Sequence, residues 1–80
     1  MKIPRNLSGI ELVKKLRSLG YVLVRQQGSH IRLTTEQNGQ HHVTVPDHFP
    51  IRLGTLNGIL KAVAAHHELS IEKIIERLFL

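Results

Sequence analysis

The segment that decides the fold reads SHIRLTTEQNGQHHVTVP over residues 29–46. Apolar and polar residues alternate strictly over 29–34 and again over 42–45, which is the pattern of strands that bury one face. Between them, Asn38-Gly39 is a strong hairpin signal, because both residues accept left-handed backbone conformations. The segment therefore predicts two antiparallel strands joined by a short loop.

The register of this hairpin follows from the apolar residues. A two-residue loop at 38–39 would place apolar side chains of one strand opposite polar ones of the other. A three-residue loop at 37–39, with Gly39 left-handed in a bulge, instead pairs Leu33 with Val43 and Ile31 with Val45. We predict the second register. It leaves a set of polar side chains together on the opposite face: His30, Arg32, Thr34, His42 and Thr44.

Before the hairpin, the sequence predicts a helix and a first strand. Ser8 and Glu11 have the spacing of a capping box, so we expect a helix that begins at Gly9 and ends at Gly20. Residues 21–26 are rich in β-formers and precede a turn at Gln27-Gly28. The apolar stripe of the helix consists of Ile10, Leu12, Val13, Leu16 and Leu19, and its polar face includes Lys14, Lys15, Arg17 and Ser18.

After the hairpin, two prolines mark a loop over residues 46–50. Helical periodicity returns from about Gly54 to Ala65, and Ser70 has the character of an N-cap for a short last helix. The predicted order is therefore αβββαα in a single domain over residues 1–80. We expect an α+β fold in which a three-stranded antiparallel sheet has helices on one face, with His30 on the open face.

The composition limits the function classes. Lys and Arg total 11 against 6 acidic residues, which gives a net charge of +5 and predicts an anionic partner such as nucleic acid. No apolar run approaches the roughly 20 residues of a membrane span, and the first residues lack the apolar core of a signal peptide. Cysteine is absent, which removes disulfides and leaves the redox compartment open. With neither a membrane span nor a signal peptide indicated, we expect a cytoplasmic protein with no membrane partner.

Several short motifs resemble, in their order and spacing, those of the HicA (YcfA-like) family of bacterial toxins. They are IPR at 3–5 with SG at 8–9, LGY at 19–21, RQQGSH at 25–30, VTVPDH at 43–48, GTL at 54–56 with ILK at 59–61, and LS at 69–70. Each is short, but together they run nearly the length of the chain. The sequence departs from the family pattern between Lys61 and Leu69, where residues 62–68 are longer by about one helical turn. This departure bears on the position of the last helix and on antitoxin docking.

The resemblance implies a fold like that of double-stranded-RNA-binding domains and a metal-independent endoribonuclease that cleaves mRNA and so blocks translation. It also implies a HicB-type antitoxin as the protein partner. The catalytic histidine of the family falls on His30.

The chemistry of that activity suits the residues near His30. Metal-free RNA cleavage needs a base for the 2′-hydroxyl proton, an acid for the leaving oxygen and cations around the phosphate. Histidine changes its charge near neutral pH, so it can transfer protons there. We interpret His30 as the base and Arg25 and Arg32 as phosphate ligands. Gly28 and Ser29 would let a phosphate approach the backbone amides.

His48, Lys14 and Arg17 are further candidates. In the predicted register Pro46 lies opposite His30, so an extended continuation would place His48 diagonally across, at about 7–8 Å between Cα atoms. His48 is therefore a candidate second catalytic residue, although a histidine that braces the 46–50 loop fits the sequence equally well. Lys14 and Arg17 are candidate RNA contacts, and a solvated helix face explains them equally well.

Neither histidine pair indicates a metal site. Residues 41–42 would point to opposite faces of a strand, and residues 66–67 do not face each other on a helix, so we expect no metal and no cofactor. Two other functions remain open, a non-catalytic RNA-binding module and a protein-interaction domain that uses the open sheet face. By periodicity alone, His30 is an ordinary surface histidine.

Overall fold

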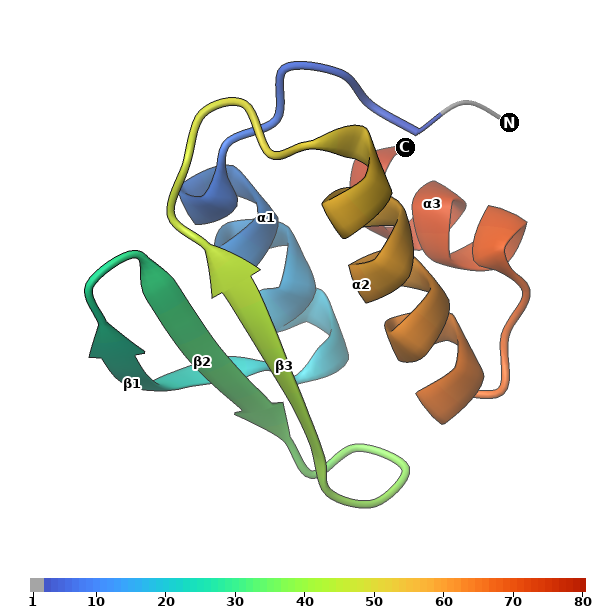
Figure 1. Ribbon diagram of the computed structural model, residues 1–80. Helices are drawn as coiled ribbons and strands as arrows, with labels where there is room; N and C mark the ends of the chain where they lie inside the picture. The colour runs from blue at the N-terminus through green and yellow to red at the C-terminus, as the bar shows by residue number, and fades with distance from the viewer. Residues whose placement is uncertain (1–2) are drawn as a thin grey trace.

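The computed structural model describes residues 3–80, and its elements follow the predicted order (Figure 1). They are α1 Gly9–Leu16, continued by a 3₁₀ turn at Arg17–Leu19, then β1 Val22–Gln27, β2 His30–Thr35, β3 His41–Pro46, α2 Leu53–His66 and α3 Ile71–Phe79. The strands form one antiparallel sheet in the order β1-β2-β3. In Figure 1, α1 lies behind this sheet, and α2 and α3 flank it on the side of β3. The predicted α+β class and the extra C-terminal helix are confirmed.

The predicted register of the hairpin is confirmed. Leu33 pairs with Val43, Ile31 pairs with Val45, and His30 lies opposite Pro46. The predicted three-residue loop is wrong, because the ladder ends at the pair Thr35–His41 and residues 36–40 lie outside it. Asn38 and Gly39 are both left-handed, with φ of 58° and 93°, so the chain turns through two such residues and leaves the ladder one pair early.

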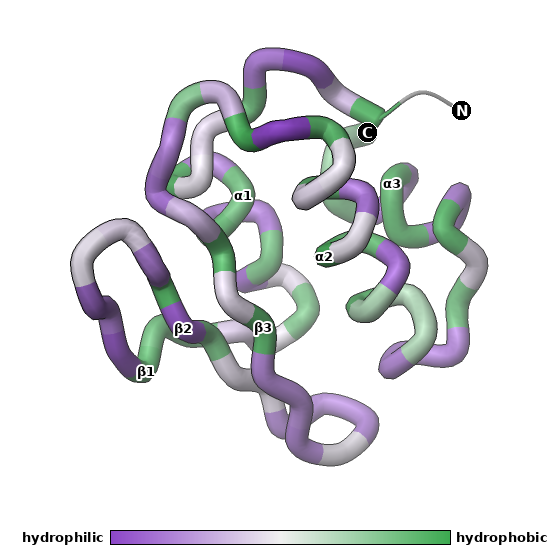
Figure 2. Tube along the Cα trace, in the orientation of Figure 1, coloured by the Kyte–Doolittle hydropathy of each residue, from purple (hydrophilic) through white to green (hydrophobic). Residues whose placement is uncertain are grey.

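The two faces of the hairpin have different surroundings. Ile31, Leu33 and Val45 are fully buried, and they pack in one continuous core with apolar side chains of all three helices. The residues between them are exposed or half-buried. Figure 2 shows the corresponding alternation of hydrophobic and hydrophilic residues along β3. The open face is therefore the one that carries His30.

The first helix differs in two respects from the expectation. The capping box is present, since the Glu11 amide donates to the Ser8 hydroxyl and the Ser8 amide donates to the Glu11 carboxylate, each at 3.0 Å. However, the α-helix ends at Leu16, and a 3₁₀ turn leads to the left-handed Gly20. Ile10 was expected in the core but is 44% exposed, because it follows the buried Gly9 on the outer side of the first turn.

At Gly9, the backbone of α1 lies in close contact with the end of β3. A Cβ atom at this position would collide with the backbone carbonyl of Pro46. The Gly9 amide also donates to the carbonyl of His48 at 3.0 Å. The start of α1 therefore holds the chain that leaves β3, and this contact requires the absence of a side chain.

At the loop end of the hairpin, buried polar groups connect β2 and β3 to the rest of the chain by hydrogen bonds. The Thr35 hydroxyl donates to the Leu19 carbonyl at 2.8 Å, and the side chain is 1% exposed. Tyr21, expected in the first strand, instead precedes it and is fully buried. Its hydroxyl lies 2.7 Å from Nδ1 of His41 and 3.2 Å from Nε2 of His67. This hydroxyl therefore joins β3 to the residue that follows α2.

His66 adds a second set of contacts at this junction. Its Nε2 lies 2.9 Å from the carbonyl oxygens of both Gln37 and Gly39, and its ring stacks on that of His41 with centroids 4.4 Å apart. The Asn38 side chain donates to the His66 carbonyl at 2.8 Å. The loop of the hairpin is thereby tied to the last turn of α2.

The last two helices agree closely with the predicted ones. α2 contributes Leu56, Leu60 and Val63 to the core, and the Ser70 hydroxyl accepts from the Lys73 amide at 3.2 Å at the start of α3. Among residues 3–80, no helix has the length and apolar content needed to cross a bilayer.

The contact at Gly9 gives a stability prediction. We expect Gly9→Ala to lower the free energy of unfolding by about 1–3 kcal/mol, because the added methyl group forces the backbone of Pro46 away from α1. Gly58→Ala is the matched control. A Cβ there meets no atom within 4 Å, so alanine should stabilise α2 by about 0.5–1 kcal/mol. Urea unfolding of both variants measures this, and equal effects would contradict the assigned contact.

The histidine junction predicts a loss of stability in mild acid. Burial, followed by the neighbouring imidazoles and, for His67, by Arg77, lowers the pKa of His41 and His67, and burial raises the pKa of Tyr21 to about 12. As the pH falls through the ordinary histidine pKa of about 6.5, the unfolded chain therefore takes up protons before the folded one does. The free energy of unfolding should then fall from pH 7.5 to pH 5.5.

Urea unfolding at several pH values measures this effect. A double variant, His41→Gln with His67→Gln, should have a flatter dependence over the same range. The same slope in that variant would show that other groups cause the acid sensitivity. NMR titration of the imidazoles in the wild-type chain gives a second check, since the midpoints of His41 and His67 should lie below 6.5.

Candidate active site

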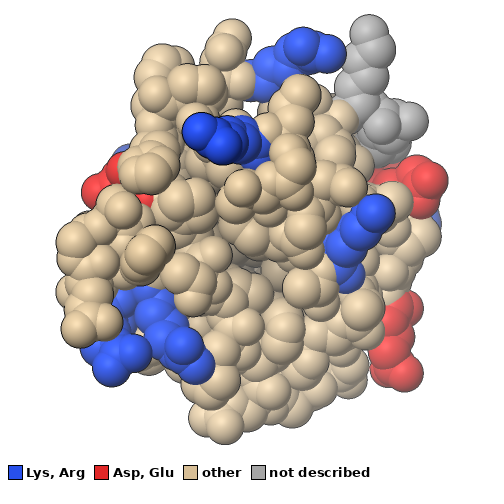
Figure 3. All heavy atoms as spheres, in the orientation of Figure 1, with Lys and Arg blue, Asp and Glu red and all other residues tan. Residues whose placement is uncertain are grey.

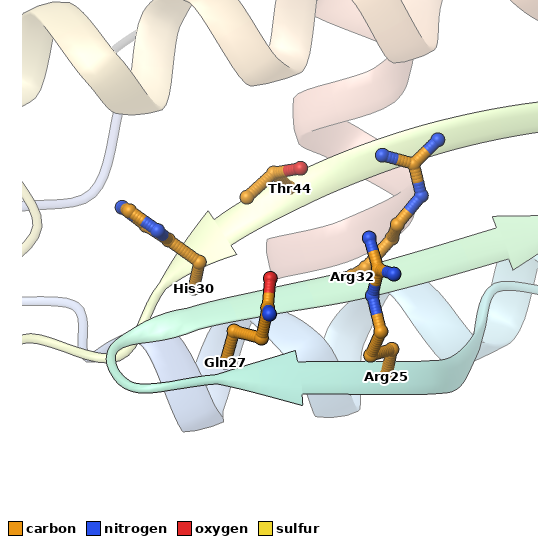
Figure 4. Close-up of a pocket in the computed structure, with 5 residues that line it drawn as sticks. All are labelled: Arg25, Gln27, His30, Arg32 and Thr44. Carbon is orange, nitrogen blue, oxygen red and sulfur yellow. The ribbon is translucent and has the colours of Figure 1, made fainter.

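His30 is the first residue of β2, which is the central strand of the three-stranded sheet. It pairs with Gln27 on β1 and with Pro46 on β3. Its side chain is exposed at one end of a shallow pocket of about 180 Å³. The pocket is lined by Arg25, Gln27, His30, Arg32 and Thr44 (Figure 4). All five belong to the strands, so the sheet itself forms the floor of the candidate site.

Arg25 and Arg32 lie directly opposite each other on β1 and β2. In Figure 4 their guanidinium groups lie close together above the sheet, and Gln27 and Thr44 lie between them and His30. No carboxylate lines the pocket. Two guanidinium groups of this kind can hold a phosphate through several hydrogen bonds at once, with an imidazole on the same surface.

A bulge in β1 brings Arg25 into this site. Leu23 pairs with Leu33, but Arg25 pairs with Arg32, so Val24 is an extra residue in the strand. In a regular strand Val24 would face Arg32, and Arg25 would fall on the same side as the buried Ile31. The bulge instead turns Arg25 to the open face, as bulges beside functional sites commonly do. The strand pattern of residues 21–26 contains no sign of it.

Gln27 and Thr44 were not predicted as site residues. Gln27 lies opposite His30 because only Gly28 and Ser29 separate the two strands. Its amide can both donate and accept hydrogen bonds, so it can contact a phosphate, a 2′-hydroxyl or a base edge. The sequence signal for its placement is the short turn at Gly28, because the length of that turn sets the register of β1 against β2.

Gly28 and Ser29 lie at the end of the pocket but do not line it. Gly28 is left-handed, with φ of 56°, and its position is open, since a Cβ there would meet no atom within 4 Å. The Ser29 carbonyl accepts from the Asp47 amide at 2.6 Å. The turn is therefore accessible, and it is fixed to the chain that leaves β3.

The other predicted residues lie outside the pocket. His48 is exposed in the irregular segment after β3, its backbone carbonyl accepts from the Gly9 amide, and its side chain does not line the pocket. Lys14 is exposed on α1 and Arg17 is exposed on the 3₁₀ turn that follows it, and α1 itself lies behind the sheet (Figure 1). The structure brings together His30, Arg25 and Arg32, and it does not bring Lys14 or Arg17 to them.

The histidines do not form a metal-binding cluster in the part of the chain from residue 3 to residue 80. No group of three or more His, Cys, Asp or Glu side chains there is arranged to hold an ion. His41 and His67 are engaged with the Tyr21 hydroxyl, and His66 with loop carbonyls. At the pocket itself, the side chains that the structure brings together include one imidazole and two guanidinium groups.

Comparison with known proteins identifies the family. The sequence profile described as "HicA toxin of bacterial toxin-antitoxin" matches residues 9–64, which include every strand, α1 and most of α2. No curated protein and no solved structure gives a significant match. The profile covers more than half of the chain, and it contains the whole of the pocket around His30. The chain therefore belongs to the HicA family, the toxins of bacterial toxin–antitoxin systems.

Proposed function

We propose that this chain is a metal-independent endoribonuclease that cleaves mRNA in the cytoplasm and is inhibited by a HicB-type antitoxin. The observation that carries the proposal is the pocket in which Arg25 and Arg32 lie beside His30 on an open face without a carboxylate. Binding and cleavage of a phosphodiester require cations near the phosphate. An open face also admits a polymer, which an enclosed cavity in so small a chain could not hold.

The proposed reaction uses the 2′-hydroxyl of the RNA as nucleophile. His30 accepts its proton while the 2′-oxygen bonds to phosphorus, and the bond from phosphorus to the 5′-oxygen breaks. Arg25 and Arg32 stabilise the charge that develops on the non-bridging oxygens. The leaving oxygen takes a proton from an acid, for which His48 or a water molecule is available; the cleavage rate of a His48→Ala variant tests the former. The products are a 2′,3′-cyclic phosphate and a 5′-hydroxyl.

The exposed apolar residues of the edge strand β1 support the proposal of a protein partner. The side chains of Val22, Leu23 and Val24 are 56%, 53% and 51% exposed. Three consecutive exposed apolar residues on an edge strand favour association with another chain. Arg25 and Gln27 follow on the same strand and line the pocket. An antitoxin that covers this edge would therefore also obstruct access to His30.

The role of His30 is tested in cells. We expect induced wild-type protein to arrest growth and to degrade mRNA, and His30→Ala to do neither while it remains folded, because the side chain is exposed. Growth arrest at wild-type strength by folded His30→Ala would sink the proposal. By contrast, Ile31→Ala should lower the free energy of unfolding by about 2–5 kcal/mol, since it removes fully buried atoms. The two neighbours thus separate chemistry from stability.

Metal independence is tested with purified protein and a single-stranded RNA. Cleavage should proceed at the same rate with and without EDTA, because the imidazole and guanidinium groups supply the proton transfer and charge. An RNA without stable secondary structure serves as substrate, so that metal effects on RNA folding do not enter. Loss of cleavage in EDTA that Mg²⁺ restores would contradict the mechanism.

A further inference from the structure

A second hollow lies where the N-terminal segment meets the segment that leads into α2. Its volume is about 370 Å³, and it is lined by Arg5, Asn6, Pro50, Ile51, Arg52 and Leu53. Both arginines are exposed, and no carboxylate is among the lining residues. The proposed reaction at His30 does not use any of these residues.

This hollow has a fixed backbone. The Ile51 amide donates to the Leu7 carbonyl at 2.9 Å, and the side chains of Leu7 and Ile51 are 7% and 4% exposed in the core. Arg5 lies two residues before Leu7, and Arg52 directly follows Ile51. The two arginines therefore lie on chain segments that are hydrogen-bonded to each other and held by buried side chains in the core.

An exposed aromatic residue directly precedes residues 50–53 of this hollow in the sequence, although it does not line the hollow itself. Phe49 directly precedes Pro50 and is 70% exposed, more than any other large apolar residue of residues 3–80 except the terminal Leu80. Proteins that bind single-stranded nucleic acid combine cations for the phosphates with aromatic rings on which bases stack. Neither the core nor the His30 pocket accounts for this ring.

We propose that Phe49, Arg5 and Arg52 form a second RNA subsite, which holds unpaired nucleotides next to the bond that is cleaved at His30. The inference rests on the proposed function, from which it takes RNA as the ligand. Phe49 stacks on a base, and the arginines bind the phosphates that flank it. Because stacking requires an unpaired base, the subsite selects single-stranded RNA without choosing its sequence.

The position of the subsite relative to His30 fits one continuous strand. Pro46 is the sheet partner of His30, and Phe49 follows it by three residues, which span at most about 11 Å even when fully extended. Figure 3 shows basic side chains over β1 and β2 and again toward the top, near the segment that enters α2, while carboxylates lie at the margins. A strand that crosses this face thus meets positive charge at both ends.

The test measures RNA binding without cleavage. Every chain carries His30→Ala, and fluorescence anisotropy gives the affinity for two labelled RNAs, a dinucleotide and a single strand of about ten nucleotides. Arg5→Ala, Arg52→Ala and Phe49→Ala are compared with Lys73→Ala. The control removes one exposed cation from α3, away from the sheet (Figure 1).

We expect the long RNA to bind more tightly than the dinucleotide, and this advantage to shrink in the three variants but not in Lys73→Ala. Phe49→Ala should weaken binding of the long RNA at least about fivefold, and Phe49→Trp should restore it. The affinity for RNA falls as the salt concentration rises, and each arginine variant should make this dependence less steep. The magnitude of the slope of log affinity against log salt should decrease by about 0.7 for each phosphate that the missing guanidinium no longer binds.

Two outcomes would overturn the proposed subsite. In the first, the three variants bind the long RNA as tightly as Lys73→Ala does. In the second, they bind RNA normally but lose affinity for an antitoxin protein, which would make this surface a protein interface. The result is separable from the proposed activity. If the chain binds RNA through Phe49 but never cleaves it, the proposed nuclease activity is refuted and the subsite stands. If the chain cleaves RNA and these variants leave cleavage unaffected, the activity stands and the subsite is refuted.

Discussion

The burial of one face of β2 is the constraint on which the rest of this structure depends. Ile31 and Leu33 are inaccessible to solvent, and side chains along a strand alternate between faces. A slip of one residue would move His30 and Arg32 into the core, where unpaired polar and charged groups cost several kcal/mol. Core packing therefore fixes which residues the sheet displays, although none of the core residues lines the pocket.

The site is also an outcome of how regular strands are interrupted. The extra residue Val24 turns Arg25 toward Arg32, and the two-residue turn at Gly28 places Gln27 opposite His30. The close approach at Gly9 fixes the chain that leaves β3 beside the same turn. Each is a local departure from regular structure, and together they bring polar side chains from different strands to one shallow pocket.

The histidines divide into two groups by environment. His30, His42 and His48 are exposed. At the other end of the hairpin, His41 and His67 lie beside the Tyr21 hydroxyl, and the ring of His66 packs against both of them. His66 is the last residue of α2 and His67 directly follows it. The contacts of His66 with the carbonyls of Gln37 and Gly39 tie the end of α2 to the hairpin loop.

The sequence by itself determined the elements, the register of β2 against β3 and the open face, because these follow from local periodicity, capping residues and the need to bury the apolar side of each strand. The choice of His30 came from the resemblance to the HicA motifs, since periodicity alone makes it an ordinary surface histidine. Only the tertiary structure decided that Arg25 reaches the open face, that the His48 carbonyl is held by the Gly9 amide, and that His48, Lys14 and Arg17 lie outside the pocket. The physical reason is that a bulge, a close backbone contact and the packing of α1 behind the sheet depend on residues far apart in the chain, which no local pattern contains.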